Sequence, residues 1–201
     1  MRRRQALEIK ALVTSAFESI SRDPQPACAW DSGDSQPTSS GGCDERFTEA
    51  RERMVERQIR RRGVRDPNVL SAMQRVPRDA FVPTGLHEFA YDDTPLPLEG
   101  GQSISQPVIV AKMLEAAELH PGDHVLDVGT GSGYSAAIAA EIAARVESIE
   151  RHPAVAETAR ERLRQLGYAN VAVHLGDGTA GLADHAPFCG VRLRAASRND
   201  A

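Results

Sequence analysis

The amino-acid sequence predicts an α/β fold built around a parallel β-sheet. From residue 107 onward, segments with helical periodicity alternate with short strands rich in Val, Leu and Ile. Strand, helix, strand, helix and strand at this spacing indicate parallel strands joined by right-handed crossovers. The chain before residue 107 is helical and irregular, which predicts a smaller helical subdomain attached to the sheet.

The composition is that of an ordinary soluble globular domain. Of 201 residues, 41% are hydrophobic and 26% are charged, and the formal net charge is −4. This acidic balance argues against a nucleic-acid partner. No apolar run approaches the roughly 18 residues of a membrane span, and the Arg-rich start lacks the apolar core of a secretory signal. We therefore expect a cytoplasmic monomer without a membrane partner.

No metal site is indicated by the sequence. Cys28, Cys43 and Cys189 lie far apart, without a CxxC pair or paired histidine spacing. None of the histidines pairs with a nucleophile at a meaningful spacing, so all are interpreted as surface or hydrogen-bonded residues. The six histidines are His87, His120, His124, His152, His174 and His185.

The chain before the sheet divides into a leader and a helical segment. Residues 1–44 are expected to be a disordered leader, because its Ser-, Pro- and Gly-rich part cannot bury enough surface to offset ordering entropy. A charge-rich helix is predicted over 45–62, with Gly63 as its C-terminal glycine. Asp66 and Pro67 are the N-cap and first residue of a second helix.

An irregular connection and the sheet elements follow in order. Residues 77–99 contain four prolines and are expected to form an ordered but irregular connection whose aromatic residues Phe81, Phe89 and Tyr91 pack against another part of the protein. A helix with period 3.6 starts at residue 107 and ends before a His-Pro-Gly stop. The elements expected after it are a strand over 124–128, a glycine loop over 129–133, a helix over 134–144, a strand over 145–150, a helix over 153–166 and a strand with its turn over 170–178.

A glycine loop follows the first predicted strand. Its glycines are Gly129, Gly131 and Gly133, and Asp127 precedes them. A dinucleotide fingerprint needs its third glycine at the position of Tyr134, so the spacing disfavours NAD. Such a loop lets the backbone approach a ligand closely, and the start of the next helix presents free N–H groups.

Acidic residues end the next two strands. Glu150 is placed to accept hydrogen bonds from ribose hydroxyls, and Asp177 from an exocyclic amine such as that of adenine. Each feature alone has a structural interpretation, as a tight turn or a solvated strand end. Together, at successive carboxyl ends of parallel strands, they favour a nucleoside-containing cofactor.

Six segments follow one another within roughly residues 46–188: VPRDAFVP, YDDTPLPL, GGQSISQP, VLDVGTGSGY, SIER and LGDGTAGL. In this order they resemble protein-L-isoaspartate O-methyltransferases, a family of class I S-adenosylmethionine-dependent methyltransferases. The resemblance implies a Rossmann-like sheet and S-adenosylmethionine as the cofactor. The cofactor contacts it implies are Asp127, Gly129, Thr130, Gly131, Ser132, Gly133, Glu150, Asp177 and Gly178.

The resemblance also implies a reaction and its substrate. The family methylates the free carboxylate of L-isoaspartyl and D-aspartyl residues in age-damaged proteins, and the ester then collapses to a succinimide. Ser105 is implied as the active-site residue, with Ser103, Ile104 and Gln106 on the substrate side. The structural alternative makes Ser105 only the N-cap of the helix at Pro107, worth about 1 kcal/mol.

The hydroxyl and N–H donors near Ser105 are suited to methyl transfer onto a carboxylate. A carboxylate with a pKa near about 4 is ionised at neutral pH and needs no general base. The cofactor's sulfonium already provides a good leaving group. The protein then has to align the oxygen, the methyl carbon and the sulfur, and this alignment can lower the barrier by roughly 7 to 11 kcal/mol. Hydroxyl and N–H donors can orient the carboxylate, whereas a pair of arginines would stabilise the ground state.

The chain departs from the family pattern after Phe188. The family continues with an acid and a buried strand, whereas here CGVRLRAASRNDA follows. We therefore expect a three-stranded sheet, incomplete at its C-terminus through a frameshift or premature stop, with low stability and weak or absent activity. The domains expected are a leader (1–44), a helical substrate-side segment (45–105), a partial cofactor-binding domain (106–188) and an aberrant tail (189–201).

Two other functions stay open. One is a non-catalytic remnant that binds S-adenosylmethionine. The other is a methyltransferase for RNA or a small molecule that uses the arginines between Arg57 and Arg65. The net charge and the absence of an NPPY-type base pocket oppose the second, and the arginines are also interpretable as a solvated helix face.

Overall fold

The structure, a computed structural model, describes residues 41–98 and 102–193, all within one compact unit that begins at Gly41. The leader up to residue 40, the two glycines of GGQSISQP and residues 194–201 lie outside this range. The elements are α2 (Gly41–Met54), η1 (Val55–Ile59), η2 (Arg60–Arg62), α3 (Pro67–Arg75), η3 (Arg78–Phe81), η4 (Thr84–Phe89), β1 (Leu96–Pro97), β2 (Ser103–Ile104), α4 (Pro107–Ala116), β3 (His124–Val128), α5 (Tyr134–Ala140), β4 (Arg145–Glu150), α6 (Pro153–Gln165), β5 (Val171–Leu175), η6 (Gly178–Ala180), η7 (Ala183–His185) and β6 (Gly190–Leu193).

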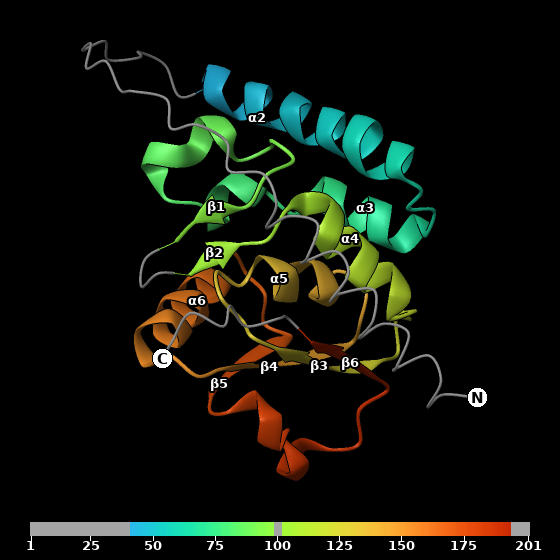
Figure 1. Cartoon of the computed structure of the whole chain (residues 1–201), viewed down its shortest axis with the longest axis vertical. Helices are drawn as coiled ribbons and strands as arrows, with labels where there is room; N and C mark the ends of the chain where they lie inside the picture. Colours follow the sequence, from blue (N-terminus) through green and yellow to red (C-terminus); the bar gives the residue numbers. More distant parts are fainter. Residues whose placement is uncertain (1–40, 99–101, 194–201) are drawn as a thin grey trace, which may run out of the picture. The chain divides into compact units, whose positions relative to one another are not determined.

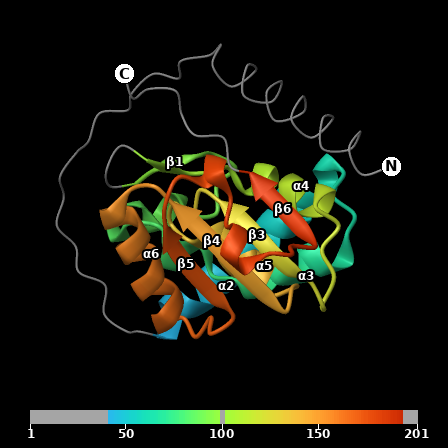
Figure 2. The same ribbon diagram turned by 90° about the horizontal axis from the view of Figure 1, so that it is seen from below.

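The main sheet has four parallel strands in the order β5-β4-β3-β6, as Figure 2 shows from below. In Figure 1 the helices lie on one face of this sheet, and the loop that carries η6 and η7 lies on the other. Side chains alternate between the two faces of a strand. Val125, Val146 and Val173 therefore share the helix-facing side, where they belong to the hydrophobic core.

The α/β prediction is confirmed, but the expectation of three strands is wrong. Strand β6 pairs in parallel with β3, from Val125 opposite Gly190 to Val128 opposite Leu193. Just before it, the Cys189 N–H donates to the His124 carbonyl at 2.8 Å. An edge strand needs only main-chain donors and acceptors to pair, so a sequence without an apolar run can still occupy the free side of β3.

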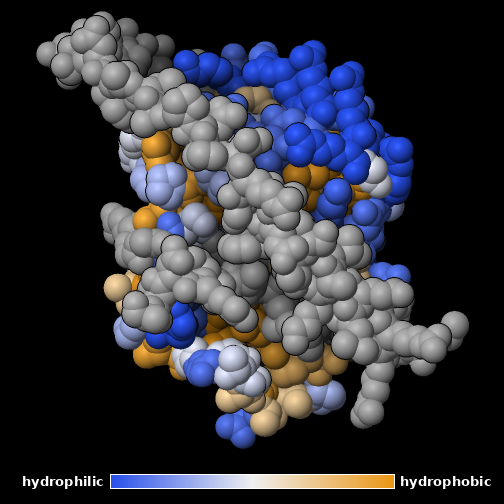
Figure 3. Space-filling model, in the orientation of Figure 1, coloured by the Kyte–Doolittle hydropathy of each residue, from blue (hydrophilic) through white to orange (hydrophobic). Residues whose placement is uncertain are grey.

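The N-terminal helices follow their predicted capping signals. The helical run extends through α2, η1 and η2 to Gly63, whose φ of 95° is the left-handed conformation expected of a C-terminal glycine. It starts at Gly41, inside the segment expected as leader. The Asp66 carboxylate accepts from the N–H groups of Asn68 and Val69, as an N-cap should. In Figure 3 hydrophilic residues cover this charge-rich α2.

Two expectations about the middle of the chain need correction. Helix α5 ends at Ala140, four residues before the end of its predicted range, and at this end the Asn170 side chain donates to the carbonyls of Ala140 and Ala143 at 2.9 and 3.3 Å. Among the aromatic residues expected to pack, Phe81 and Tyr91 are buried, whereas Phe89 is 37% exposed and packs only in part. Within the described residues, no helix is long and apolar enough to cross a membrane.

Candidate functional site

The glycine loop joins the carboxyl ends of two neighbouring strands. Gly129, Gly131 and Gly133 have φ angles of 90°, 53° and 90°, a region that L side chains rarely adopt. The N–H groups of Gly129 and Thr130 both donate to the carbonyl of Ile149 on β4, at 2.8 and 3.2 Å. The loop that follows β3 is therefore tied to the end of β4.

Glu150 strengthens this connection. One carboxylate oxygen accepts from the Gly131 N–H at 2.9 Å, and the other accepts from the N–H groups of Arg151 and His152 at 3.0 and 3.1 Å. The residue is only 5% exposed. A carboxylate has about four acceptor sites, so Glu150 keeps capacity for one hydroxyl without losing a backbone contact. Accepting both ribose hydroxyls, as expected from the sequence, requires that one of these backbone bonds be shared or lost.

Asp127 supports the loop from beneath. Its carboxylate accepts from the Ser148 hydroxyl at 2.8 Å, and the Ser148 oxygen lies 2.6 Å from the Thr130 hydroxyl. Because the Ser148 proton is used toward Asp127, Thr130 donates to Ser148. Asp127 and Ser148 are completely buried, and Thr130 is 1% exposed. These buried side chains support the glycine loop from below.

Ser132 has a similar supporting role. Its hydroxyl accepts from the Tyr134 N–H at 3.3 Å, and its carbonyl accepts from Arg162 of α6 at 3.0 Å. A cavity of about 190 Å³ borders Gly131 and Ser132 on the α6 side. Its walls include two of the predicted cofactor contacts, Gly131 and Ser132, and none of the predicted acids. They are formed by Pro83, Leu98, Gly131, Ser132, Ala154, Val155, Thr158 and Arg162.

Asp177 lies at the end of β5, as predicted. Its carboxylate accepts from the Thr179 N–H at 2.9 Å, and this bond lowers the pKa of the exposed side chain below its ordinary value. Gly178 has a packing reason of its own, because a Cβ at this position would lie 2.2 Å from a methyl group of Val128. The turn interpretation and the cofactor interpretation are therefore compatible.

The predicted substrate side forms a short ribbon that runs into α4. Ser103 is exposed on β2, whereas Ile104 is 2% exposed and packs in the core, which limits any ligand contact to its main chain. Ser105 is half-buried. The N-cap of α4 is Gln106 without a side-chain cap bond, so the interpretation of Ser105 as an N-cap is wrong. Instead, the Gln106 amide donates to the Asp93 carbonyl at 2.5 Å.

Arg78 is a residue that sequence reasoning missed. Its side chain is completely buried and donates to the carbonyls of Ala90 and Ser105 at 2.7 and 2.9 Å, and to Thr94 at 3.4 Å. Its guanidinium also lies 5.2 Å from the ring centroid of Tyr134, the first residue of α5 after the glycine loop. Arg78 thus joins the Ser105 segment to the glycine-loop helix. The only sequence signal was an arginine within the family-like segment VPRDAFVP.

The arginines between Arg57 and Arg65 are partly neutralised. Arg60 pairs with Glu56 at 2.9 Å and Arg62 pairs with Asp93 at 2.5 Å. These pairs favour the interpretation as a solvated helix face over a nucleic-acid surface.

Comparison with solved structures defines the class. The chain superimposes on a protein-L-isoaspartate O-methyltransferase with a TM-score of 0.61 at 28% identity, over 69% of this chain and 45% of the other. It superimposes on a Plasmodium falciparum protein described as a beta-aspartate methyltransferase, in complex with S-adenosyl-L-homocysteine, with a TM-score of 0.53 at 25% identity, over 65% and 62% of the two chains. The fold is that of a class I S-adenosylmethionine-dependent methyltransferase.

Sequence comparison narrows the class to a family. The profile of the family Protein-L-isoaspartate(D-aspartate) O-methyltransferase (PCMT) matches residues 49–199, which extends past Phe188. Protein-L-isoaspartate O-methyltransferase 2 of Pelobacter propionicus is 56% identical over 138 residues, and the Methylorubrum extorquens enzyme is 52% identical over 164 residues. The chain belongs to this family. The matches cover 69% and 82% of this chain, and 61% and 71% of the two relatives.

Proposed function

We propose that this chain transfers a methyl group from S-adenosylmethionine to the free carboxylate of L-isoaspartyl residues in damaged proteins. Family membership over residues 49–199 supports the reaction, and the S-adenosyl-L-homocysteine complex of the Plasmodium falciparum protein supports the cofactor. The net charge of −4 and the paired arginines favour protein substrates over nucleic acid. We infer that the protein acts as a monomer in the cytoplasm.

The strand-end residues fit such a cofactor. Glu150 keeps acceptor capacity for a ribose hydroxyl, and the exposed Asp177 can accept from an adenine amine. The glycine loop presents backbone that carries no Cβ, which permits close approach of the methionine part. When bound, S-adenosylmethionine supplies an activated methyl group on sulfur.

The protein's remaining task is to hold the substrate carboxylate in line with that methyl group. The carboxylate is the nucleophile and is already ionised, so Ser105 acts as a hydrogen-bond donor that orients it, and no side chain has to remove a proton. A neutral hydroxyl leaves the negative charge largely available for attack. We assign Ser105 as the catalytic residue, with Ser103 and Gln106 beside it.

The observation that carries the proposal is the burial of Arg78 between the substrate-side segment and the helix that follows the glycine loop. A charged side chain without exposure is costly unless its hydrogen bonds are made, and Arg78 makes them to three carbonyls. One carbonyl belongs to Ser105, and the guanidinium stacks on Tyr134 at the start of α5. The substrate-side segment and the cofactor loop are thus held by one rigid group, which suits a reaction that depends on alignment.

The test uses the full chain with labelled S-adenosylmethionine and a peptide that contains one isoaspartyl residue. We expect a base-labile methyl ester, and none with the matched peptide that contains normal aspartate. Ser105→Ala should reduce transfer by roughly tenfold to 10²-fold through lost alignment while cofactor affinity stays nearly unchanged. Glu150→Gln and Asp177→Asn should weaken cofactor binding instead.

Three results would contradict the proposal. Equal loss of cofactor affinity in Ser105→Ala and Glu150→Gln would make Ser105 structural. Cofactor binding without methyl transfer would support a non-catalytic remnant. Salt-sensitive RNA binding with methylation of RNA would support a different substrate class.

A further inference from the structure

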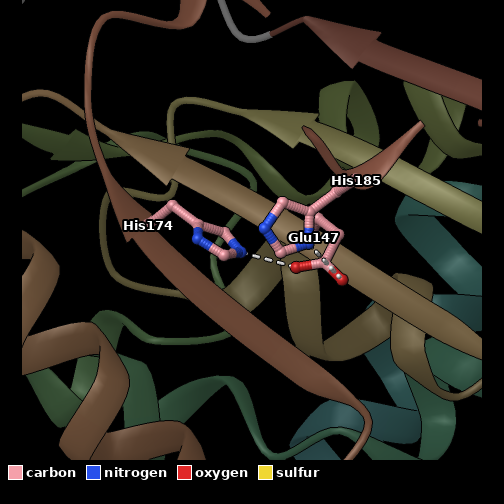
Figure 4. A group of neighbouring side chains, drawn as sticks. All are labelled: Glu147, His174 and His185. Carbon is pink, nitrogen blue, oxygen red and sulfur yellow. Dashed lines mark hydrogen bonds and ion pairs between the residues drawn. The ribbon is translucent and has the colours of Figure 1, made fainter. Parts of the chain in front are cut away.

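On the face of the sheet opposite the helices, three side chains converge on one point. Glu147 comes from β4, His174 from β5 and His185 from η7, and Figure 4 shows both imidazoles directed toward the carboxylate. Ser148 contacts Asp127 beneath the glycine loop, so its neighbour Glu147 points to the opposite face. His174 and His185 are partly exposed, and His174 is hydrogen-bonded, as expected from the sequence, but the sequence did not indicate that they lie together.

The distances within this cluster are short. His174 Nε2 lies 2.5 Å from Glu147 Oε2, and His185 Nδ1 lies 3.6 Å from Glu147 Oε1. The rings of His174 and His185 are 4.7 Å apart between centroids. One potential ligand atom from each of the three residues lies within 4.8 Å of the other two.

Hydrogen bonding explains only part of this arrangement. The Glu147 side chain is completely buried, and contacts with His174 and with Arg145, whose Nε lies 2.5 Å from Oε1, already compensate its charge. Burial acts to raise the pKa of Glu147, but hydrogen bonds from His174 and His124 and the charge of Arg145 outweigh it and lower the pKa. His185 at 3.6 Å is too far for a hydrogen bond to the carboxylate.

We propose that Glu147, His174 and His185 bind a divalent transition metal ion of the zinc type. Two imidazoles and a carboxylate are ligands that Zn²⁺ and Co²⁺ accept, whereas Mg²⁺ and Ca²⁺ prefer oxygen ligands alone. In a tetrahedral zinc site with bonds of about 2.1 Å, two ligand atoms lie about 3.4 Å apart. The 3.6 Å gap between His185 and Glu147 is close to this value.

Only small side-chain movements are needed for binding. The ion replaces the hydrogen bond between His174 Nε2 and Glu147 Oε2, and these two atoms move apart from 2.5 Å. Both imidazoles are partly exposed, at 25% and 34%, and are free to adjust. The Arg145 side chain is 57% exposed and can turn into solvent. A water molecule would complete the coordination, as in zinc sites with three protein ligands.

The site would join β4, β5 and the loop between β5 and β6. It lies on the opposite side of the sheet from the Asp127–Ser148 pair that supports the glycine loop. The proposal is therefore independent of methyl transfer. Its expected consequence is that metal restrains the loop that carries η7, without a direct contribution to the reaction.

The test uses the untagged full chain, stripped of metal by a chelator, and titrates it with Co²⁺ and then with Zn²⁺. We expect one equivalent of Co²⁺ to give the intense visible absorption of a tetrahedral site, and Zn²⁺ to displace it. His174→Gln and His185→Gln should each weaken binding by about 10²-fold or more, since even the loss of a residue that only supports a ligand costs 10- to 10²-fold. Glu147→Gln should weaken it similarly.

A matched control is available in His120→Gln. His120 also lies beside a carboxylate, at 3.7 Å from Asp123, but it is 75% exposed and belongs to no convergent group among the residues that the structure describes. We expect this variant to bind Co²⁺ as the unchanged protein does, and circular dichroism to show all variants folded. The proposal is overturned if no saturable binding occurs at micromolar Co²⁺, or if folded His174→Gln and His185→Gln bind as tightly as His120→Gln.

Discussion

Arg78 has more influence on this molecule than its single position in the sequence suggests. Lysine keeps the charge at this site but cannot reach three carbonyls with a planar fork of donors. We predict that Arg78→Lys lowers the free energy of unfolding by about 2 to 4 kcal/mol, because buried polar groups lose their partners. Urea unfolding measures the change, and methyl transfer should fall together with it.

Arg75→Lys is the matched control for Arg78→Lys. Arg75 also makes several bonds, to Glu141 and Ser71 at 2.6 Å each, but its side chain is 50% exposed. Exposed ion pairs contribute little, so we expect a loss below about 1 kcal/mol. Equal losses in the two variants would show that burial of Arg78 is not the cause.

The buried residues Tyr91 and Tyr134 differ in whether the hydroxyl makes a hydrogen bond. The Tyr91 hydroxyl donates to Asp79, whereas the buried Tyr134 hydroxyl has no hydrogen-bond partner among the residues that the structure describes. Removing an unpaired buried hydroxyl ends a desolvation penalty, while removing a bond to a charged acceptor loses about 1.5 to 3 kcal/mol. We predict that Tyr134→Phe leaves stability unchanged or raises it, and that Tyr91→Phe lowers it.

Thermal unfolding of both variants tests the pair. A fall in the melting temperature of Tyr134→Phe as large as that of Tyr91→Phe would mean that the Tyr134 hydroxyl is bonded in solution. The comparison is internal, because both substitutions remove the same atom from a largely buried ring.

At the scale of elements, Gly178 sets the distance between the β5 turn and β3. A methyl group added there would overlap a Val128 methyl at 2.2 Å. We predict that Gly178→Ala costs about 1 to 3 kcal/mol, as overpacking does. Adding Val128→Ala should recover part of the loss, which a urea-unfolding double-mutant cycle would detect.

Gly122→Ala provides the control for this substitution. Gly122 is exposed, and an added Cβ would meet nothing within 4 Å. We expect a neutral effect or a gain below about 1 kcal/mol, from reduced freedom of the unfolded chain. If Gly178→Ala behaved in the same way, the turn would have room that the structure does not indicate.

Elements whose ends depend on local signals could be predicted from the sequence. Asp66 caps α3 through bonds to the next few residues, and Gly63 ends the preceding helix by its own φ angle. The contacts at the end of α5 could not be predicted, because Asn170 makes them from 27 to 30 residues away. The supporting role of Asp127 also depends on a neighbouring strand.

At the scale of the whole molecule, all three tyrosines resist ionisation. Burial raises the pKa of Tyr134 to about 12, and burial together with the charge of Glu141 raises the pKa of Tyr168 to about 12. Burial and the hydrogen bond to Asp79 also raise the pKa of Tyr91. The chain contains three tyrosines in total, so none should ionise in its ordinary range while the protein is folded.

This arrangement predicts alkaline unfolding. Because the folded-state pKa values are raised, the tyrosines contribute their full stability below pH 10.0, the ordinary tyrosine pKa, and lose it as pH rises from there toward about 12. Tyrosinate absorbance should remain low near pH 10 and then rise together with the loss of circular dichroism. The urea-unfolded chain is the control and should titrate near pH 10. Ionisation of one tyrosine near pH 10 in the folded protein would contradict this prediction.

The sequence by itself determined the order of helices and strands along the chain, the glycine loop, the acids at the strand ends and the family. These depend on periodicity and short motifs, which local backbone preferences and hydrophobic burial translate directly into helices and strands. It could not determine the fourth strand, because β6 pairs with β3 from more than 60 residues away through main-chain bonds that side-chain patterns do not encode.

Only the tertiary structure decided which side chains meet. Arg78 contacts both the Ser105 carbonyl and the Tyr134 ring. Glu147 lies beside His174 of a neighbouring strand and His185 of a loop. Both groups combine residues that are distant in sequence. Their meeting depends on strand order and packing, and the free energy of those contacts is realised only when the whole sheet and its helices are assembled.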